Sequence, residues 1–187
     1  MRYALLLMAF TLMLCTTSAL TQTQSMQQQA QINKMLDHLK AAPSPAAAAA
    51  LEGELQSLWV NQGSPAVRLL MGRGLREMEA GNYAQAVQSF DDVVTLDPNS
   101  AEAYRQLAMA RYAAGDAQGA IEDLALAVQH EPRDFLAYKS LSEIAAQRGD
   151  WKGAYEAWQK LLALDPNTPG GQDKLKELQV KAFGQET

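Results

Sequence analysis

The chain has 187 residues, of which 48% are hydrophobic and 20% charged, and a formal net charge of −5 at pH 7. This length suits one domain of ordinary size. An acidic chain without a cluster of lysines and arginines is a poor nucleic-acid binder. The single cysteine, Cys15, lies in the apolar N-terminal stretch, so the rest of the chain has no disulfide and no thiol nucleophile.

Residues 1–19 predict a cleavable signal peptide. Arg2 supplies a positive start, and the apolar run 4–15 has signal-peptide length but is short for a membrane span. Thr17 and Ala19 place small residues at positions −3 and −1 of a cleavage site. We expect an exported protein, periplasmic or secreted, with no stable membrane insertion after cleavage. The alternative is an uncleaved leader that acts as an anchor.

Residues 20–31 are polar and glutamine-rich, and we expect a flexible segment there. Residues 32–62 predict a helical hairpin that closes one end of the structure that follows. The spacing of its apolar residues is helical in both halves: Ile32, Met35, Leu36 and Leu39, then Leu51, Leu55, Leu58 and Trp59. Between the halves, Pro43 ends one helix, and Ser44 and Pro45 can begin the next.

Residues 63–168 contain one outline three times at a 34-residue spacing, in the units 67–100, 101–134 and 135–168. Each unit reads as a helix, a turn of Gly followed by Asn or Asp, a second helix and a stop at proline. A fixed period of this length indicates a stacked helical array. Small residues occupy the eighth and twentieth places and large ones the twenty-fourth: Gly74, Ala108 and Ser142; Ala86, Ala120 and Ala154; Phe90, Leu124 and Trp158.

This pattern resembles the tetratricopeptide repeat, which has a large residue at position 4, small ones at 8 and 20, an aromatic at 24 and proline at 32. The second and third units match best, through Tyr104, Leu107, Ala108, Ala120, Ala127 and Pro132, then Tyr138, Leu141, Ser142, Ala154, Trp158 and Pro166. The first unit departs at Leu70, Arg73 and Val93. The resemblance implies an all-α fold, an α-solenoid of three such hairpins preceded by the N-terminal hairpin.

Residues 169–187 predict a C-terminal capping helix and a short tail. Leu175 and Leu178 give this helix one apolar face, and charged residues surround the rest. Terminal elements of repeat arrays usually carry such a polar outer surface.

The sequence offers no recognisable catalytic, cofactor or metal site. The two histidines, His38 and His130, have no serine or acid at a motif spacing, and no metal-binding motif is present. Asp91 and Asp92 are neighbours on a helix and point about 100° apart, so they cannot easily share a proton or a metal. We therefore expect a protein that is not an enzyme and that needs no cofactor.

The resemblance implies a binding surface on the concave face, formed by positions 2, 5, 9, 12 and 13 of each first helix. The predicted partner-binding residues are Arg68, Met71, Leu75, Met78, Arg105, Met109, Tyr112, Lys139 and Glu143. Methionine adapts to loosely specified apolar ligands, and the basic residues could hold an acidic segment. The alternative is that the methionines pack against a neighbouring helix, such as the N-terminal hairpin.

The expected function is a non-enzymatic adaptor or scaffold of the bacterial cell envelope that binds a partner segment on this face. A self-associating structural protein, or a pocket for a small peptide-like ligand, are the alternatives. Clamping of a chaperone's C-terminal carboxylate is disfavoured, because that use of the family needs lysine and asparagine where Met71 and Leu75 stand. Arg73 is expected to pair with an acid on a second helix, one of Asp91, Asp92 and Asp123.

Overall fold

The computed structural model describes residues 25–184, which form helices joined by short turns and contain no strand. Residues 25–40 are helical and are called here the N-terminal helix. The following helices are α2 (Pro45–Val60), α3 (Pro65–Glu79), α4 (Tyr83–Leu96), α5 (Ala101–Ala113), α6 (Ala117–His130), α7 (Phe135–Gln147), α8 (Trp151–Leu164) and α9 (Gly171–Phe183). The all-α prediction is confirmed. The predicted signal peptide lies outside the described residues.

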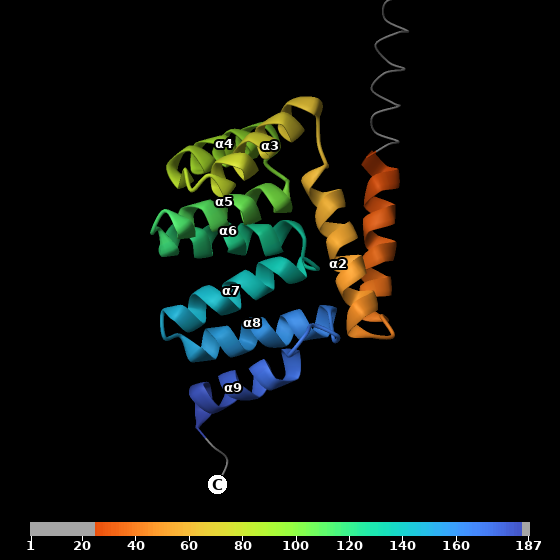
Figure 1. The fold of residues 1–187 in the computed structure, drawn as a ribbon, viewed down its shortest axis with the longest axis vertical. Helices are drawn as coiled ribbons and strands as arrows, with labels where there is room; N and C mark the ends of the chain where they lie inside the picture. Colours follow the sequence, from red (N-terminus) through yellow and green to blue (C-terminus); the bar gives the residue numbers. More distant parts are fainter. Residues whose placement is uncertain (1–24, 185–187) are drawn as a thin grey trace, which may run out of the picture.

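Three helical hairpins, α3/α4, α5/α6 and α7/α8, stack one on the next, and α9 follows the last of them (Figure 1). The turns inside the hairpins have the predicted chemistry, since Gly81, Gly115 and Gly149 all have φ between 74° and 95°. After two of them an aspartate caps the second helix: Asp116 accepts a hydrogen bond from the Gly119 amide, and Asp150 one from the Gly153 amide.

Small side chains let the two helices of each hairpin approach closely. A Cβ at Gly74 would lie 2.5 Å from a ring carbon of Phe90, so only glycine fits beside that ring. In the third unit the Ser142 hydroxyl donates a hydrogen bond of 2.8 Å to the Ala154 carbonyl across the same kind of contact. The solenoid of helical hairpins that the spacing predicts is thus built as expected.

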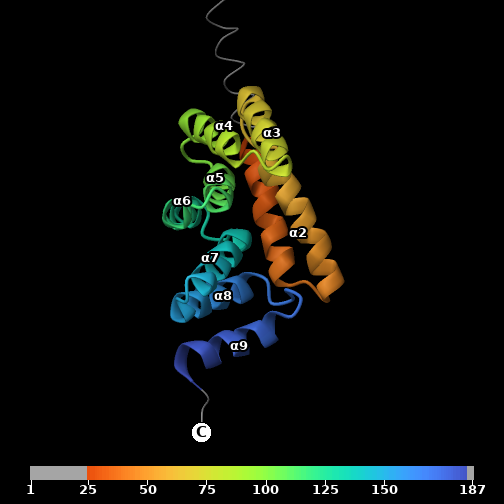
Figure 2. The ribbon, with the colours of Figure 1, turned by 60° about the vertical axis from the view of Figure 1, so that its left-hand side comes forward.

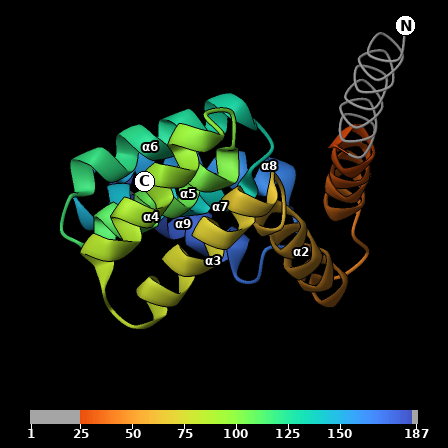
Figure 3. The same ribbon diagram turned by 90° about the horizontal axis from the view of Figure 1, so that it is seen from above.

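The N-terminal helix and α2 form a hairpin, which lies beside the stack rather than on its end (Figure 1; Figure 3). Figure 2 shows it on the side of α3 and α7, away from α4 and α6. It shares a hydrophobic core with the third unit, where the Trp59 and Phe135 rings lie 5.7 Å apart. The expectation that this hairpin closes an end of the array is therefore wrong, because its apolar face is buried against the side.

The polar segment predicted for residues 20–31 is helical over its described part, residues 25–31. No proline or glycine interrupts this stretch, and glutamine is a good helix former. Gln28 also donates a hydrogen bond of 3.4 Å to the Leu58 carbonyl of α2. The prediction of a flexible segment is corrected for these residues.

At the other end of the chain, α9 covers the third unit. Leu178 is fully buried, and the Trp158 indole donates a hydrogen bond of 2.8 Å to the Gly171 carbonyl. The outer surface of α9 carries lysines and glutamates, with Val180 and Phe183 also exposed. Within residues 25–184, none of the helices combines the length and hydropathy needed to cross a membrane.

Candidate functional site

The predicted partner-binding residues come from α3, α5 and α7, and we call the surface formed by these helices the first-helix face. The structure divides the predicted residues into three groups by exposure. Arg68, Lys139 and Glu143 are exposed; Leu75, Met78, Met109 and Tyr112 are half-buried; Met71 and Arg105 are buried. The last two require a correction.

Met71 belongs to the core of the first unit. Its side chain is 2% exposed and shares a cluster with Phe90 of α4 and Leu107 of α5. The alternative interpretation, that a methionine of this set packs against neighbouring helices, is therefore correct for Met71. The neighbours come from the stack itself.

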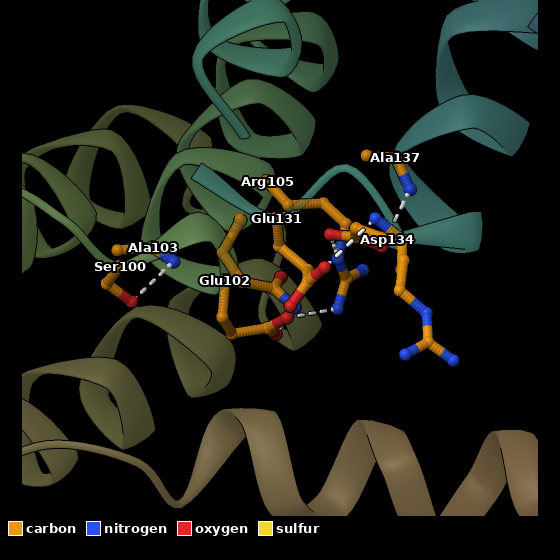
Figure 4. A network of polar contacts seen from close by, with 9 residues as sticks. Ser100, Glu102, Ala103, Arg105, Glu131, Asp134 and Ala137 are labelled. Atoms are coloured by element: carbon orange, nitrogen blue, oxygen red, sulfur yellow. Dashed lines mark hydrogen bonds and ion pairs between the residues drawn. The ribbon is translucent and has the colours of Figure 1, made fainter. Parts of the chain in front are cut away.

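Arg105 is 5% exposed and forms ion pairs within the chain (Figure 4). Its Nη2 lies 2.5 Å from Glu102 Oε2, and its Nε lies 3.4 Å from Asp134 Oδ2. Gln106 donates a hydrogen bond of 2.8 Å to the other Glu102 oxygen, and Asp134 accepts one of 3.0 Å from the Ala137 amide as the N-cap of α7. Arg105 is thus not a free charge for a partner, because two carboxylates of the same chain already hold it.

This network buries more negative than positive charge. Burial raises the pKa values of Glu102 and Asp134, although the Arg105 guanidinium opposes the shift at both. The two carboxylates in turn raise the pKa of Arg105 against its own burial. One guanidinium therefore compensates two buried carboxylates, so the network depends strongly on that side chain.

A cavity of about 330 Å³ separates this network from the N-terminal hairpin. The hairpin contributes Gln28, Gln29 and Trp59 to its wall, and the repeats contribute four acids, Asp97, Glu102, Glu131 and Asp134. Sequence reasoning missed this cavity because its walls come from segments far apart in the chain. The one periodic signal is an acid at position 31 of every unit, which is Asp97, Glu131 and Asp165.

Two of the three acids expected to pair with Arg73, Asp91 and Asp123, pair with another arginine. Arg111 of α5 donates to both oxygens of Asp123 at 2.7 Å, and its Nη2 lies 4.0 Å from Asp91 of α4. Burial raises the pKa of Asp123 to about 6, although Arg111 lowers it. Among the described residues Arg73 is exposed and forms no ion pair, so that prediction is wrong.

The half-buried residues leave an accessible apolar strip on the first-helix face. Leu75 and Met78 lie on α3, and Met109 and Tyr112 occupy the same positions on α5. The Tyr112 hydroxyl donates a hydrogen bond to Gln147 of α7, which joins the second and third units. The exposed polar members of the face are at its ends, Arg68 on α3 and Lys139 and Glu143 on α7.

Comparison with known proteins supports the resemblance to tetratricopeptide repeats. Residues 77–144 match the family model described as tetratricopeptide repeat. The chain is 43% identical over 56 residues to tetratricopeptide repeat protein 36 of Mus musculus, and the match spans only about 30% of the length of either chain. A TPR repeat-containing protein of Rhizobium etli is 23% identical over 156 residues, 83% of this chain and 76% of the relative.

Several solved structures share the fold. The first repeat domain of Spaghetti (RPAP3), bound to an HSP90 peptide, superposes with a TM-score of 0.58 at 20% identity over 62% of this chain and 92% of that one. PcrH in complex with the chaperone-binding region of PopD gives 0.59 at 17% identity, over 65% and 96%. MamA gives 0.52 at 28% identity, over 63% and 74%.

Proposed function

We propose that this chain is a non-enzymatic protein-interaction module that binds a segment of a partner on the first-helix face. The observation that carries the proposal is the apolar strip of Leu75, Met78, Met109 and Tyr112, whose side chains remain partly exposed on this face. Adaptable methionines and a tyrosine are side chains that protein interfaces favour. Tetratricopeptide folds are typically interaction modules rather than enzymes, and the RPAP3 and PcrH structures each hold a partner peptide or binding region.

The polar part of the recognition is concentrated on the third unit. Arg105 is withdrawn into its ion-pair network, and Arg68 donates a hydrogen bond of 2.7 Å to the Gly63 carbonyl. Lys139 is therefore the basic residue of the predicted set that forms no hydrogen bond or ion pair within residues 25–184. A partner segment with apolar side chains and an acidic end fits this face best.

We place this function in the bacterial cell envelope. The support is the predicted leader, with its apolar run and small residues before Leu20. N-terminal sequencing of the protein recovered from a soluble extracytoplasmic fraction should begin near Leu20. Recovery of membrane-bound protein that retains Met1 would contradict the export proposal but leave the binding proposal standing.

Site-specific photocrosslinking tests the binding face. A photoreactive residue at Met109 of α5 should capture a partner from an envelope extract. The same residue at Leu126 of α6, the second helix of the same unit, should not. The captured protein is then purified and its affinity measured for the wild type and for Met109→Asp. We expect the substitution to weaken binding with the helical circular dichroism unchanged. Capture from Leu126 alone, or equal affinity for both proteins, would place the working surface elsewhere.

A further inference from the structure

The N-terminal hairpin is attached to the repeats by contacts distant in sequence and by one short connection. Asp37 of the N-terminal helix pairs with Arg133 at 2.6 Å, and Asn167 donates a hydrogen bond of 2.7 Å to the Ala42 carbonyl in the hairpin turn. The covalent link between α2 and α3 contains Gly63, whose φ of 85° favours glycine. These polar contacts add to the hydrophobic core that the hairpin shares with the third unit, so the strength of its attachment depends on both.

The interface also contains two carboxyl groups that interact with each other, those of Glu52 and Asp165. Asp165, at the C-terminal end of α8, is 0% exposed. Its Oδ1 accepts from the Asn167 amide at 3.2 Å, and its Oδ2 accepts from the Thr168 hydroxyl at 2.5 Å. Glu52 of α2 lies within hydrogen-bonding reach of Asp165, and its Oε1 is shielded from water without a donor. Within residues 25–184 neither carboxyl group takes part in an ion pair.

Two ionised carboxylates in this position repel each other, and a shielded oxygen without a donor is costly. One proton removes both problems, because the Glu52 carboxyl can then donate to the Asp165 carboxylate. Burial is the main reason that the pKa of Glu52 is raised, followed by the hydrogen bond and the charge of Asp165. Lys139 of α7 is the cation that acts on Glu52, and it lowers this pKa.

We propose that the contact between the N-terminal hairpin and the third unit is a proton-dependent clasp, closed by a hydrogen bond from the Glu52 carboxyl to Asp165 and loosened when that proton is lost. The direction follows from the raised pKa of Glu52. Protonated Glu52 stabilises the clasp fully below its ordinary pKa of 4.5. This stabilisation is lost as the pH rises through the raised pKa. The clasp is a property of the isolated chain and holds whether or not the proposed partner exists.

Distance measurement between spin labels tests the clasp directly. In the full chain carrying Cys15→Ser, labels are placed at the exposed positions Gln56 on α2 and Ala125 on α6. We expect one narrow distance distribution at about pH 5 and a broader one at about pH 8. Glu52→Gln, which keeps the shape and a donor, should give the narrow distribution at both. Glu54→Gln, an exposed neighbour on the same helix, should behave like the wild type.

A second variant tests the electrostatics without touching the pair. Lys139→Gln removes the cation that lowers the pKa of Glu52, so the pH of half-opening should move upward. Helical circular dichroism is recorded for every variant at both pH values to confirm folding. A wild-type distribution that does not change with pH would overturn the proposal. So would a Glu52→Gln protein that titrates like the wild type, or a downward shift in Lys139→Gln.

Discussion

Replacing Arg105 with methionine should destabilise the fold much more than the loss of a surface arginine. Methionine has a similar length and fills the space, but Glu102 and Asp134 remain buried without a cation. Removing one partner of a buried ion pair costs about 3–5 kcal/mol, because the charge left behind is neither solvated nor compensated. Arg133→Met breaks an exposed ion pair with Asp37 instead and should cost under about 1 kcal/mol.

Urea denaturation followed by circular dichroism measures both free energies of unfolding. For a domain of this size, about 3–5 kcal/mol corresponds to a fall in Tm of about 6–20 °C. The defect of Arg105→Met should shrink in acid, because protonation neutralises carboxylates whose pKa values burial already raises. Adding Glu102→Gln and Asp134→Asn to the variant should restore most of the stability, since asparagine also caps a helix. Equal stabilities of Arg105→Met and Arg133→Met would refute the reasoning.

Three further measurements follow from the structure. Ala120→Leu should overpack a fully buried helix contact and lower the free energy of unfolding by about 1–3 kcal/mol. Gln118→Leu, at an exposed site, should change it by less than about 0.5 kcal/mol. Equal melting temperatures of the two variants would contradict this packing. NMR titration should give a pKa of about 6 for the Asp123 carboxyl. The stability that comes from its protonation should be lost as the pH rises through that value. Arg111→Met should raise this pKa further. Once a partner has been captured, Lys139→Glu should lower both its affinity and the salt sensitivity of the complex, and unchanged binding would exclude an acidic contact at α7.

The stack of hairpins could be predicted because its determinants are local and periodic. Turn glycines such as Gly115 and the small residue Ala120 recur at fixed places, and each acts on helices that are neighbours in sequence. The placement of the N-terminal hairpin has no such signal. It depends on individual contacts between distant residues, such as the hydrogen bond from Arg133 to Asp37, which are 96 positions apart.

The predicted binding residues also show what the sequence pattern cannot predict, here at a single repeat position. Position 5 holds Met71, Arg105 and Lys139 in the three units, and the structure gives them three different environments. Met71 enters a core, Arg105 an ion-pair network, and Lys139 stays exposed. The ion pair of Arg105 with Glu102 could have been predicted from the sequence, because Glu102 lies one turn earlier on the same helix. Its second acid, Asp134, comes from the next turn between units and could only be assigned once the stack was known.

These differences restrict how a partner can lie on the first-helix face. The apolar strip belongs to the first and second units, whereas Lys139 and Glu143 belong to the third. The hairpin runs along the same side of the stack, and Glu52 on it is close enough to Lys139 for the lysine to affect its pKa. An acidic group of a partner that binds Lys139 would compete with Glu52 for that lysine. Such competition weakens the effect of Lys139 on Glu52 and raises the Glu52 pKa, which favours the protonated, closed clasp. On the two proposals together, a partner bound through Lys139 would hold the hairpin closed rather than displace it.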